Sequence, residues 1–362
     1  MMRGPAERAL GIWLAIWAAM LLVLILIGGA TRLTESGLSI TEWKPVSGVL
    51  PPIGAAAWET EFARYRAIPQ YEQLNAGMSL DAFKRIYLWE YAHRLWARVV
   101  GLAFVLPFAV FLLKGVVPRA MRQRLILLLL LLIFQAALGW FMVMSGLSDR
   151  VSVSQYRLAA HLSAALVIYS ATVWIAADLL WPALRSHDPA LIRLRRRAAL
   201  LVALTAITAV AGAFVAGLRA GHAYNTFPLM GGQLVPDNYG RLLPWWRNIF
   251  ENIPAVQFNH RVVATLTVLA IMAVWARSRR RHLPGQALWL LHALLAMGVL
   301  QFGLGVATLM LGVPVVLGVL HQGGAVLLLT AALLLLRSVW DVTRLDPDRS
   351  ITRFWPVSAS GE

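Results

Sequence analysis

Four histidines of this chain lie inside long apolar segments, where an ionisable side chain is costly and is usually kept for a function. They form two pairs, His93 with His161 and His260 with His321. Each histidine falls within about the first two turns of its predicted helix, and the four helices start on the same side of the membrane. All four imidazoles are therefore expected at a similar depth in one leaflet.

Two imidazoles from facing helices suit a metal that brings its other four ligands in one plane, as haem iron does. Zinc fits less well, because it takes three or four protein ligands and the chain has no cysteine and no acidic cluster to complete the shell. The pattern predicts one haem site in each half, with His93 and His161 ligating the first iron. His260 and His321 would ligate the second. The plainer alternative is that each imidazole only bonds a neighbouring helix.

An arginine directly follows the first histidine of each pair, as Arg94 and Arg261. A guanidinium binds a carboxylate through two parallel hydrogen bonds, and haem propionates are carboxylates. Both arginines are therefore candidates for propionate contacts. Extension of the side chains to the outer lipid headgroups is an equally good explanation.

The two halves differ at one position beside these histidines. Glu90 lies three residues before His93, whereas Gln257 lies three residues before His260. Residues three apart share a helix face, so Glu90 is expected beside the first site. A carboxylate there is a candidate catalytic group, as a general base or as a stabiliser of developing positive charge. The alternative is an acidic residue favoured by the dipole near a helix N-terminus.

Eight apolar segments, each close to the roughly 20 residues needed to cross a bilayer, must position these side chains. The 362-residue chain is 59% hydrophobic and 14% charged, with a mean hydropathy of +0.67, which excludes a soluble enzyme and a disordered protein. Its net charge of +16 lies in short clusters between the segments, so nucleic-acid binding is not expected. The segments are 12–30, 88–113, 125–144, 158–181, 198–217, 258–276, 287–310 and 313–336.

The sequence also repeats itself. The motif at Glu90–Arg94 recurs at Gln257–Arg261, and the motif at Gln135–Gly139 recurs at Gln301–Gly305 with nearly the same offset. Each half holds four segments, an even number, so the two halves share one orientation in the membrane.

The fold class predicted from these repeats is an all-α polytopic membrane protein, with eight transmembrane helices in two pseudo-symmetric four-helix bundles. The first bundle comprises residues 12–181 and the second residues 198–337, and residues 338–362 form a tail.

The loops predict the orientation of the chain. The N-terminus, alternate loops and the tail carry the higher density of Lys and Arg, including the triplets Arg195–Arg197 and Arg279–Arg281. These parts are expected on the cytoplasmic side. Both termini then face the cytoplasm of a bacterium, and the histidine pairs lie toward the outer face of its inner membrane.

Two features of the outward loops are candidates for a role at the sites. The stretch 58–88 is amphipathic and rich in aromatic residues, and it is expected to be a lid over the first site or an interfacial anchor. His222, in the second outward loop, is a further candidate for the second site.

Several of these motifs together resemble haem A synthase, from about residue 10 to residue 340. The resemblance is to the bacterial and mitochondrial branch that lacks cysteines. It rests on Gly28–Ser39, Glu90–Arg94, Gly221–Met230, Phe258–Arg261 and His321–Gln322.

The resemblance implies a reaction and its partners. Haem A synthases oxidise a ring methyl of haem O to a formyl group through successive hydroxylations, which gives haem A for cytochrome oxidase. By position, His93 and His161 would hold the substrate haem O beside Glu90, and His260 and His321 would hold haem b. Haem O synthase and the assembly factors of cytochrome oxidase are the implied partners. A cysteine pair of some family members is absent here, so no thiol step operates in this chain.

The residues alone leave two other functions open. One is a diheme b-type electron-transfer cytochrome, such as a subunit of a quinol oxidoreductase, although two haems in one leaflet suit a transmembrane electron path poorly. The other is a haem transporter, although the spans hold few polar residues near the midplane. Only the resemblance selects methyl oxidation. A homo-oligomer is compatible with the sequence.

Overall fold

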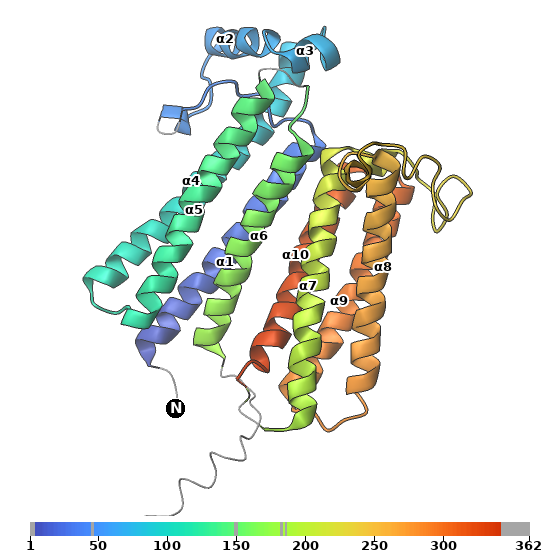
Figure 1. The fold of residues 1–362 in the computed structure, drawn as a ribbon. Helices are drawn as coiled ribbons and strands as arrows, with labels where there is room; N and C mark the ends of the chain where they lie inside the picture. The colour runs from blue at the N-terminus through green and yellow to red at the C-terminus, as the bar shows by residue number, and fades with distance from the viewer. Residues whose placement is uncertain (1–3, 45–46, 148–150, 182–183, 185–186, 342–362) are drawn as a thin grey trace, which may run out of the picture.

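The computed structural model is built of α-helices joined by loops (Figure 1). It describes residues 4–44, 47–147, 151–181, 184 and 187–341, so most of the predicted tail, from residue 342 onward, lies outside the described residues. Eight helices are long and apolar enough to cross a membrane, which confirms the eight predicted spans and a multi-pass membrane protein. They are α1 (Pro5–Leu33), α4 (Leu80–Leu113), α5 (Arg119–Leu147), α6 (Gln155–Leu180), α7 (Pro189–Gly217), α8 (Ile253–Ser278), α9 (Gly285–Met310) and α10 (Val315–Ser338).

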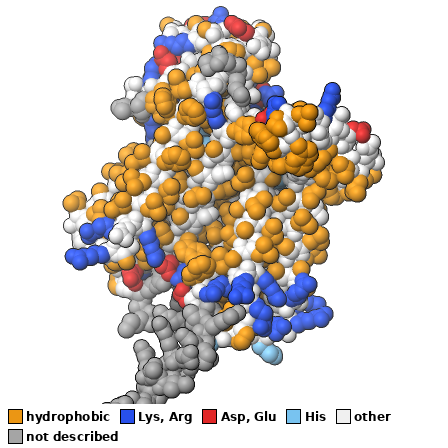
Figure 2. Space-filling view, viewed as in Figure 1, with side chains coloured by type: hydrophobic (Ala, Val, Ile, Leu, Met, Phe, Trp, Pro, Cys, Tyr) orange, Lys and Arg blue, Asp and Glu red, His pale blue; other side chains and the backbone are white. Residues whose placement is uncertain are grey.

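These segments are helical because a bilayer offers the backbone no hydrogen-bond partners, and a helix satisfies its own N–H and C=O groups. Polar residues cap three of the spanning helices at their N-termini: Ser79 accepts from Ala82 N, Asp188 from Ala190 N and Asn252 from Ala255 N. Figure 2 shows apolar side chains over the flanks of the molecule, with Lys and Arg gathered toward its ends.

The helix that carries His93 begins earlier than predicted. The apolar pattern places the start of the second span at residue 88, whereas α4 starts at Leu80. His161, His260 and His321 lie about two turns into their helices, as expected, but His93 lies about three and a half turns into α4. The extra turns form because Ser79 caps the helix and because Phe83 and Tyr87 are buried outside the apolar run.

The spanning helices contact one another as two rings of four (Figure 1). In the first ring α1, α4, α5 and α6 are neighbours in that order, and in the second ring α7, α8, α9 and α10 are. Between the rings, α1 contacts α10, α6 contacts α7, and α6 contacts α10. Exchanging each helix for its equivalent in the other half leaves this set of contacts unchanged. The arrangement is consistent with the predicted pseudo-symmetric bundles at residues 12–181 and 198–337.

Packing and interhelical hydrogen bonds hold the rings together, because lipid tails give apolar side chains no reason to prefer one another. In the first ring the buried Trp17 lies against Phe104, with ring centroids 4.5 Å apart, and donates to Val100 O at 3.0 Å. Between the rings, Gln322 Nε2 donates to Ile25 O at 2.7 Å.

An aromatic cover lies over one end of the first ring (Figure 1). It is formed by α2 (Ala55–Arg66), α3 (Pro69–Leu74) and the first turns of α4. Phe83 lies at its centre, with ring centroids 5.0 Å from Phe62 and 5.2 Å from Tyr65. Burial raises the pKa of the Tyr65 hydroxyl, so the group stays protonated at neutral pH. The amphipathic stretch 58–88 is thus two short helices and a helix start that pack on one another.

At the opposite end of the molecule, an ion pair joins the two rings. Arg337 of α10 donates to Asp178 of α6, and the Arg337 side chain is only 8% exposed. Arg124 of α5 also bonds Asp178, at 3.3 Å, but its side chain is 52% exposed. The buried guanidinium therefore depends on this carboxylate much more than the exposed one does.

Replacing Asp178 by Asn should lower the free energy of unfolding by about 3–5 kcal/mol, because it leaves the buried Arg337 without the closer of its two carboxylates. Thermal unfolding in detergent measures the change. The matched control is Arg124→Gln, which removes an exposed partner of the same carboxylate and should cost less than about 1 kcal/mol. Equal losses in the two variants would contradict the assignment.

Candidate functional site

Each of the four predicted histidines lies against a glycine of an adjacent helix. In each ring the histidines are on one pair of opposite helices and the glycines on the other pair. A β-carbon built on the glycine would lie 3.2 Å from the imidazole for Gly28 and His93, 2.9 Å for Gly139 and His161, 3.1 Å for Gly212 and His260, and 2.7 Å for Gly305 and His321. Because glycine lacks a β-carbon, the imidazole ring can lie directly against the backbone of the adjacent helix. We call each such contact a histidine–glycine cradle.

The structure brings the predicted pairs together. His93 and His161 are close enough to interact electrostatically, and so are His260 and His321. All four are surrounded by the spanning helices, yet part of each side chain is left uncovered by protein. Within the described residues, no group of three or more His, Asp or Glu side chains is placed to hold a metal ion. A metal bound at either pair would therefore bring its remaining ligands with it.

A glutamine holds the second histidine of each pair. Gln135 Nε2 donates to His161 O at 3.0 Å, and Gln301 Nε2 donates to His321 O at 2.8 Å. Gln301 Nε2 also lies 3.0 Å from His321 Nδ1. The sequence repeat predicts that the two glutamines are equivalent, and the structure adds what they contact.

The donor set fits haem. His161 Nδ1 and His260 Nδ1 are buried and have no hydrogen-bond partner. A buried polar atom without a partner is unfavourable and calls for an explanation. Haem iron accepts an imidazole nitrogen as axial ligand. In each glycine cradle the adjacent helix has no side chain that would fill the space beside the imidazole.

The carboxylate of Glu90 is fully engaged with protein groups. Glu90 is 2% exposed, and its Oε2 accepts hydrogen bonds from Ser39 Oγ and from Ile40 N, both at 2.8 Å. Its Oε1 accepts from Arg94 Nε at 3.0 Å and from Arg94 Nη2 at 2.6 Å. These four hydrogen bonds occupy both carboxylate oxygens and hold the group in one orientation.

The two arginines anchor equivalent segments of backbone. Arg94 donates to two carbonyls of segment 40–42, at 2.8 and 3.0 Å, and Arg261 donates to two carbonyls of segment 224–226, both at 2.8 Å. Arg94 also bonds Glu90, whereas Arg261 Nε is buried without a partner. Arg261 therefore keeps an N–H for a ligand, and most of the Arg94 donors are used within the protein. Both propionate contacts stay predictions, and the two arginines differ in the N–H groups that they leave without a protein partner.

Sequence analysis missed a further repeat, in the segments that follow α1 and α7. Glu35 and Arg219 occupy equivalent positions there, and both adopt a positive φ, of 58° and 52°. Their side chains form an ion pair between the two rings, with Arg219 Nη2 at 2.5 Å from Glu35 Oε2. In the sequence, glycine occurs at two equivalent positions of the two segments: Gly28 with Gly212, and Gly37 with Gly221. Two identical positions are too few to reveal a repeat.

His222 does not join the second pair by any hydrogen bond among the described contacts. It ends the short helix Ala220–His222 in the loop after α7, and its side chain is exposed. Leu38 occupies the equivalent position in the first half, so His222 has no imidazole counterpart in the repeat.

Comparison with known proteins confirms the resemblance stated above. Residues 11–333 match the family described as cytochrome oxidase assembly protein (COX15-CtaA). The chain is 47% identical to a heme A synthase of Nitrosomonas eutropha, over 91% of this chain and 93% of the relative. It is 48% identical to the heme A synthase of Rhodospirillum centenum, over 94% and 90%, and 49% identical to that of Bradyrhizobium diazoefficiens, over 91% and 92%. Since these matches cover nearly all of both chains, this chain belongs to the family of cytochrome oxidase assembly proteins.

Proposed function

We propose that the chain is a haem A synthase, which oxidises a ring methyl of haem O to a formyl group through successive hydroxylations. The proposal rests on two histidine pairs in four glycine cradles, within a chain whose relatives are heme A synthases. A diheme electron-transfer cytochrome and a haem transporter are not favoured, because relatives that match over the whole chain carry neither description.

In this proposal the two pairs have different tasks. His93 and His161 hold the substrate haem O, and His260 and His321 hold haem b. Bound haem b supplies one-electron redox chemistry. The difference between the halves supports the assignment, because the buried residue three positions before the histidine is the acid Glu90 in the first half and the amide Gln257 in the second. The aromatic cover also lies over the first ring.

Glu90 is proposed as the catalytic carboxylate of the first half. Four hydrogen bonds hold it in one orientation, so it needs no rearrangement when charge develops nearby. A fixed negative charge stabilises positive charge as the substrate methyl is oxidised. Because both carboxylate oxygens already accept hydrogen bonds from protein groups, we favour this role over that of a general base.

The proposed location is the inner membrane of a bacterium, with both termini in the cytoplasm and both haem sites toward the outer face. The Arg triplets lie at the start of α7 and just past the end of α8, which is the end of the molecule expected inside. His260 and His321 lie near the other ends of their helices. Haem O synthase, as the source of an insoluble substrate, and assembly factors of cytochrome oxidase are the proposed partners.

Haem extracted from the purified protein tests the function. After co-expression with a haem O synthase, we expect haem B together with haem O, haem A or a hydroxylated intermediate, separated by chromatography. His260→Ala should lose haem B and retain the substrate-derived haem. Haem B alone in two equivalents would indicate an electron-transfer cytochrome instead, and no haem at all would overturn the assignment of the histidines.

The glycine cradles give a second test. In Gly305→Ala the new methyl group would lie 2.7 Å from the His321 ring, so the ring must shift, and we expect the haem B content to fall about tenfold. Gly303→Ala is the matched control, because a β-carbon there meets nothing within 4 Å in the same helix. The control should keep its haem B, and it should be slightly more stable because alanine favours a helix. Equal haem loss in both variants would refute the cradle.

Two variants distinguish a role of the Glu90 charge in catalysis from a role of Glu90 in anchoring the loop. Glu90→Gln should retain haem B but lower haem A formation by about 100-fold or more, as expected when a transition-state charge interaction is lost. Ser39→Ala removes one hydrogen bond to the same carboxylate and leaves its charge, so product formation should stay within about threefold of the unchanged protein. If both variants lost product equally, Glu90 would be an anchor of the loop only.

A further inference from the structure

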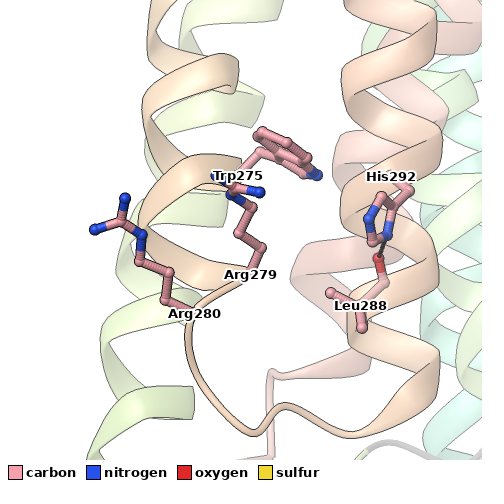
Figure 3. Close-up of a pocket in the computed structure, with 5 residues that line it drawn as sticks. All are labelled: Trp275, Arg279, Arg280, Leu288 and His292. Atoms are coloured by element: carbon pink, nitrogen blue, oxygen red, sulfur yellow. Dashed lines mark hydrogen bonds between the residues drawn. The ribbon is translucent and has the colours of Figure 1, made fainter.

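A pocket of about 500 Å³ lies between α8 and α9, far along α8 from His260. It is at the end of the molecule that carries the Arg triplet 279–281. It is open to the surface, with α8 on one side and α9 on the other (Figure 3), and it is lined by Trp275, Arg279, Arg280, Leu288 and His292. None of these residues takes part in the proposed haem sites.

The pocket presents positive charge with no acidic partner. Among the described residues, no Asp or Glu forms an ion pair with Arg279 or Arg280. The Arg279 guanidinium lies over the Trp275 ring, 4.9 Å from its centroid, which holds the charge at the wall of the pocket. An anion is therefore the class of ligand that the pocket suits.

An unused hydrogen-bond donor also points into this space. Trp275 Nε1 is buried without a partner and faces α9 (Figure 3). On the opposite wall, His292 Nδ1 bonds Leu288 O at 2.8 Å, which fixes the imidazole with its other nitrogen on the side of Trp275 (Figure 3). The two rings meet edge to face, with centroids 6.0 Å apart, so a phosphate oxygen would satisfy the indole N–H from beside this contact.

The surroundings favour a lipid as the source of that phosphate. Leu266, Leu269 and Met272 are exposed and lie three residues apart along α8, so they form an oblique row that winds around the helix and ends next to Trp275. This stripe gives acyl chains an apolar surface that begins at the pocket. Basic pockets between transmembrane helices at their cytoplasmic ends bind the headgroups of anionic lipids.

We propose that the pocket binds the phosphate headgroup of an anionic phospholipid, with Arg279 and the Trp275 N–H as its donors and Arg280 as a further positive charge at its edge. The acyl chains lie along the exposed stripe of α8. The proposal does not depend on which haem occupies either histidine pair.

Native mass spectrometry of the full-length protein in detergent, titrated with phosphatidylglycerol, tests the site. The unchanged protein should bind this anionic lipid more tightly than phosphatidylcholine, which carries the same phosphate but no net charge. Losing two arginine charges should weaken binding of phosphatidylglycerol by about 30-fold in the double variant R279Q/R280Q. Trp275→Phe removes one N–H only and should weaken it by about tenfold.

The matched control is R119Q/R122Q, which removes two exposed charges at the start of α5, at the same end of the molecule but outside the pocket. It should change lipid binding by less than about twofold. Equal loss in the two double variants would mean that general surface charge attracts the lipid, and the pocket would be rejected. Equal binding of the two lipids, or displacement of phosphatidylglycerol by inorganic phosphate, would also reject the proposed lipid. Unchanged haem content in each variant shows that it has folded.

Discussion

The close approach of an imidazole to a bare helix backbone is the contact on which both candidate sites depend. A histidine among apolar helices must have a partner for its ring nitrogens and room for its ring. The structure provides the room four times in the same way, by a glycine on the adjacent helix. It provides part of the bonding through Gln135 and Gln301, which fix the backbone of the histidine that follows. The nitrogens still without a partner, at His161 and His260, are where a ligand is needed.

This contact also explains why the helices form rings of four. In each ring two opposite helices carry the histidines, and the two helices between them carry the glycines. Because a glycine has no side chain, the intervening helices can pack close to the imidazoles, and both imidazoles can then face a common ligand. Glycines at positions 139 and 305 allow this on α5 and α9, and those at 28 and 212 allow it on α1 and α7. The same geometry occurs in both halves although most of the residues around it differ. The two halves therefore share the packing geometry of the ring, whereas most of the residues that form it differ.

The sequence predicts the features that depend on hydropathy and spacing. Eight spans and the pairing of the histidines follow from apolar length and from the repeated offset, and the structure contains both the spans and the close pairs. The start of α4 was predicted wrongly, because its first turns are buried by the aromatic cover rather than by lipid, and a hydropathy pattern does not distinguish the two. The loop partners of Glu90 were not predictable, since Ser39 and Ile40 reach it through a loop whose path no local pattern specifies. The ion pair between Glu35 and Arg219 was not predicted either, because equivalent positions that carry opposite charges do not appear as a repeat in a sequence.

The two halves diverge most in the charge that surrounds the outward segments. In the first half Arg94 is neutralised by Glu90, and the two side chains together anchor segment 40–42. In the second half Arg261 anchors segment 224–226 beside an uncharged glutamine, and no Asp or Glu of the described residues forms an ion pair with it. One scaffold thus offers a neutral ion pair in one ring and a net positive charge in the other. Because the reduction potential of a bound haem depends on nearby net charge, a duplicated fold with two chemically equivalent histidine pairs can still give its two sites different properties. The substitution at a single helical position, Glu90 against Gln257, is enough to create that difference.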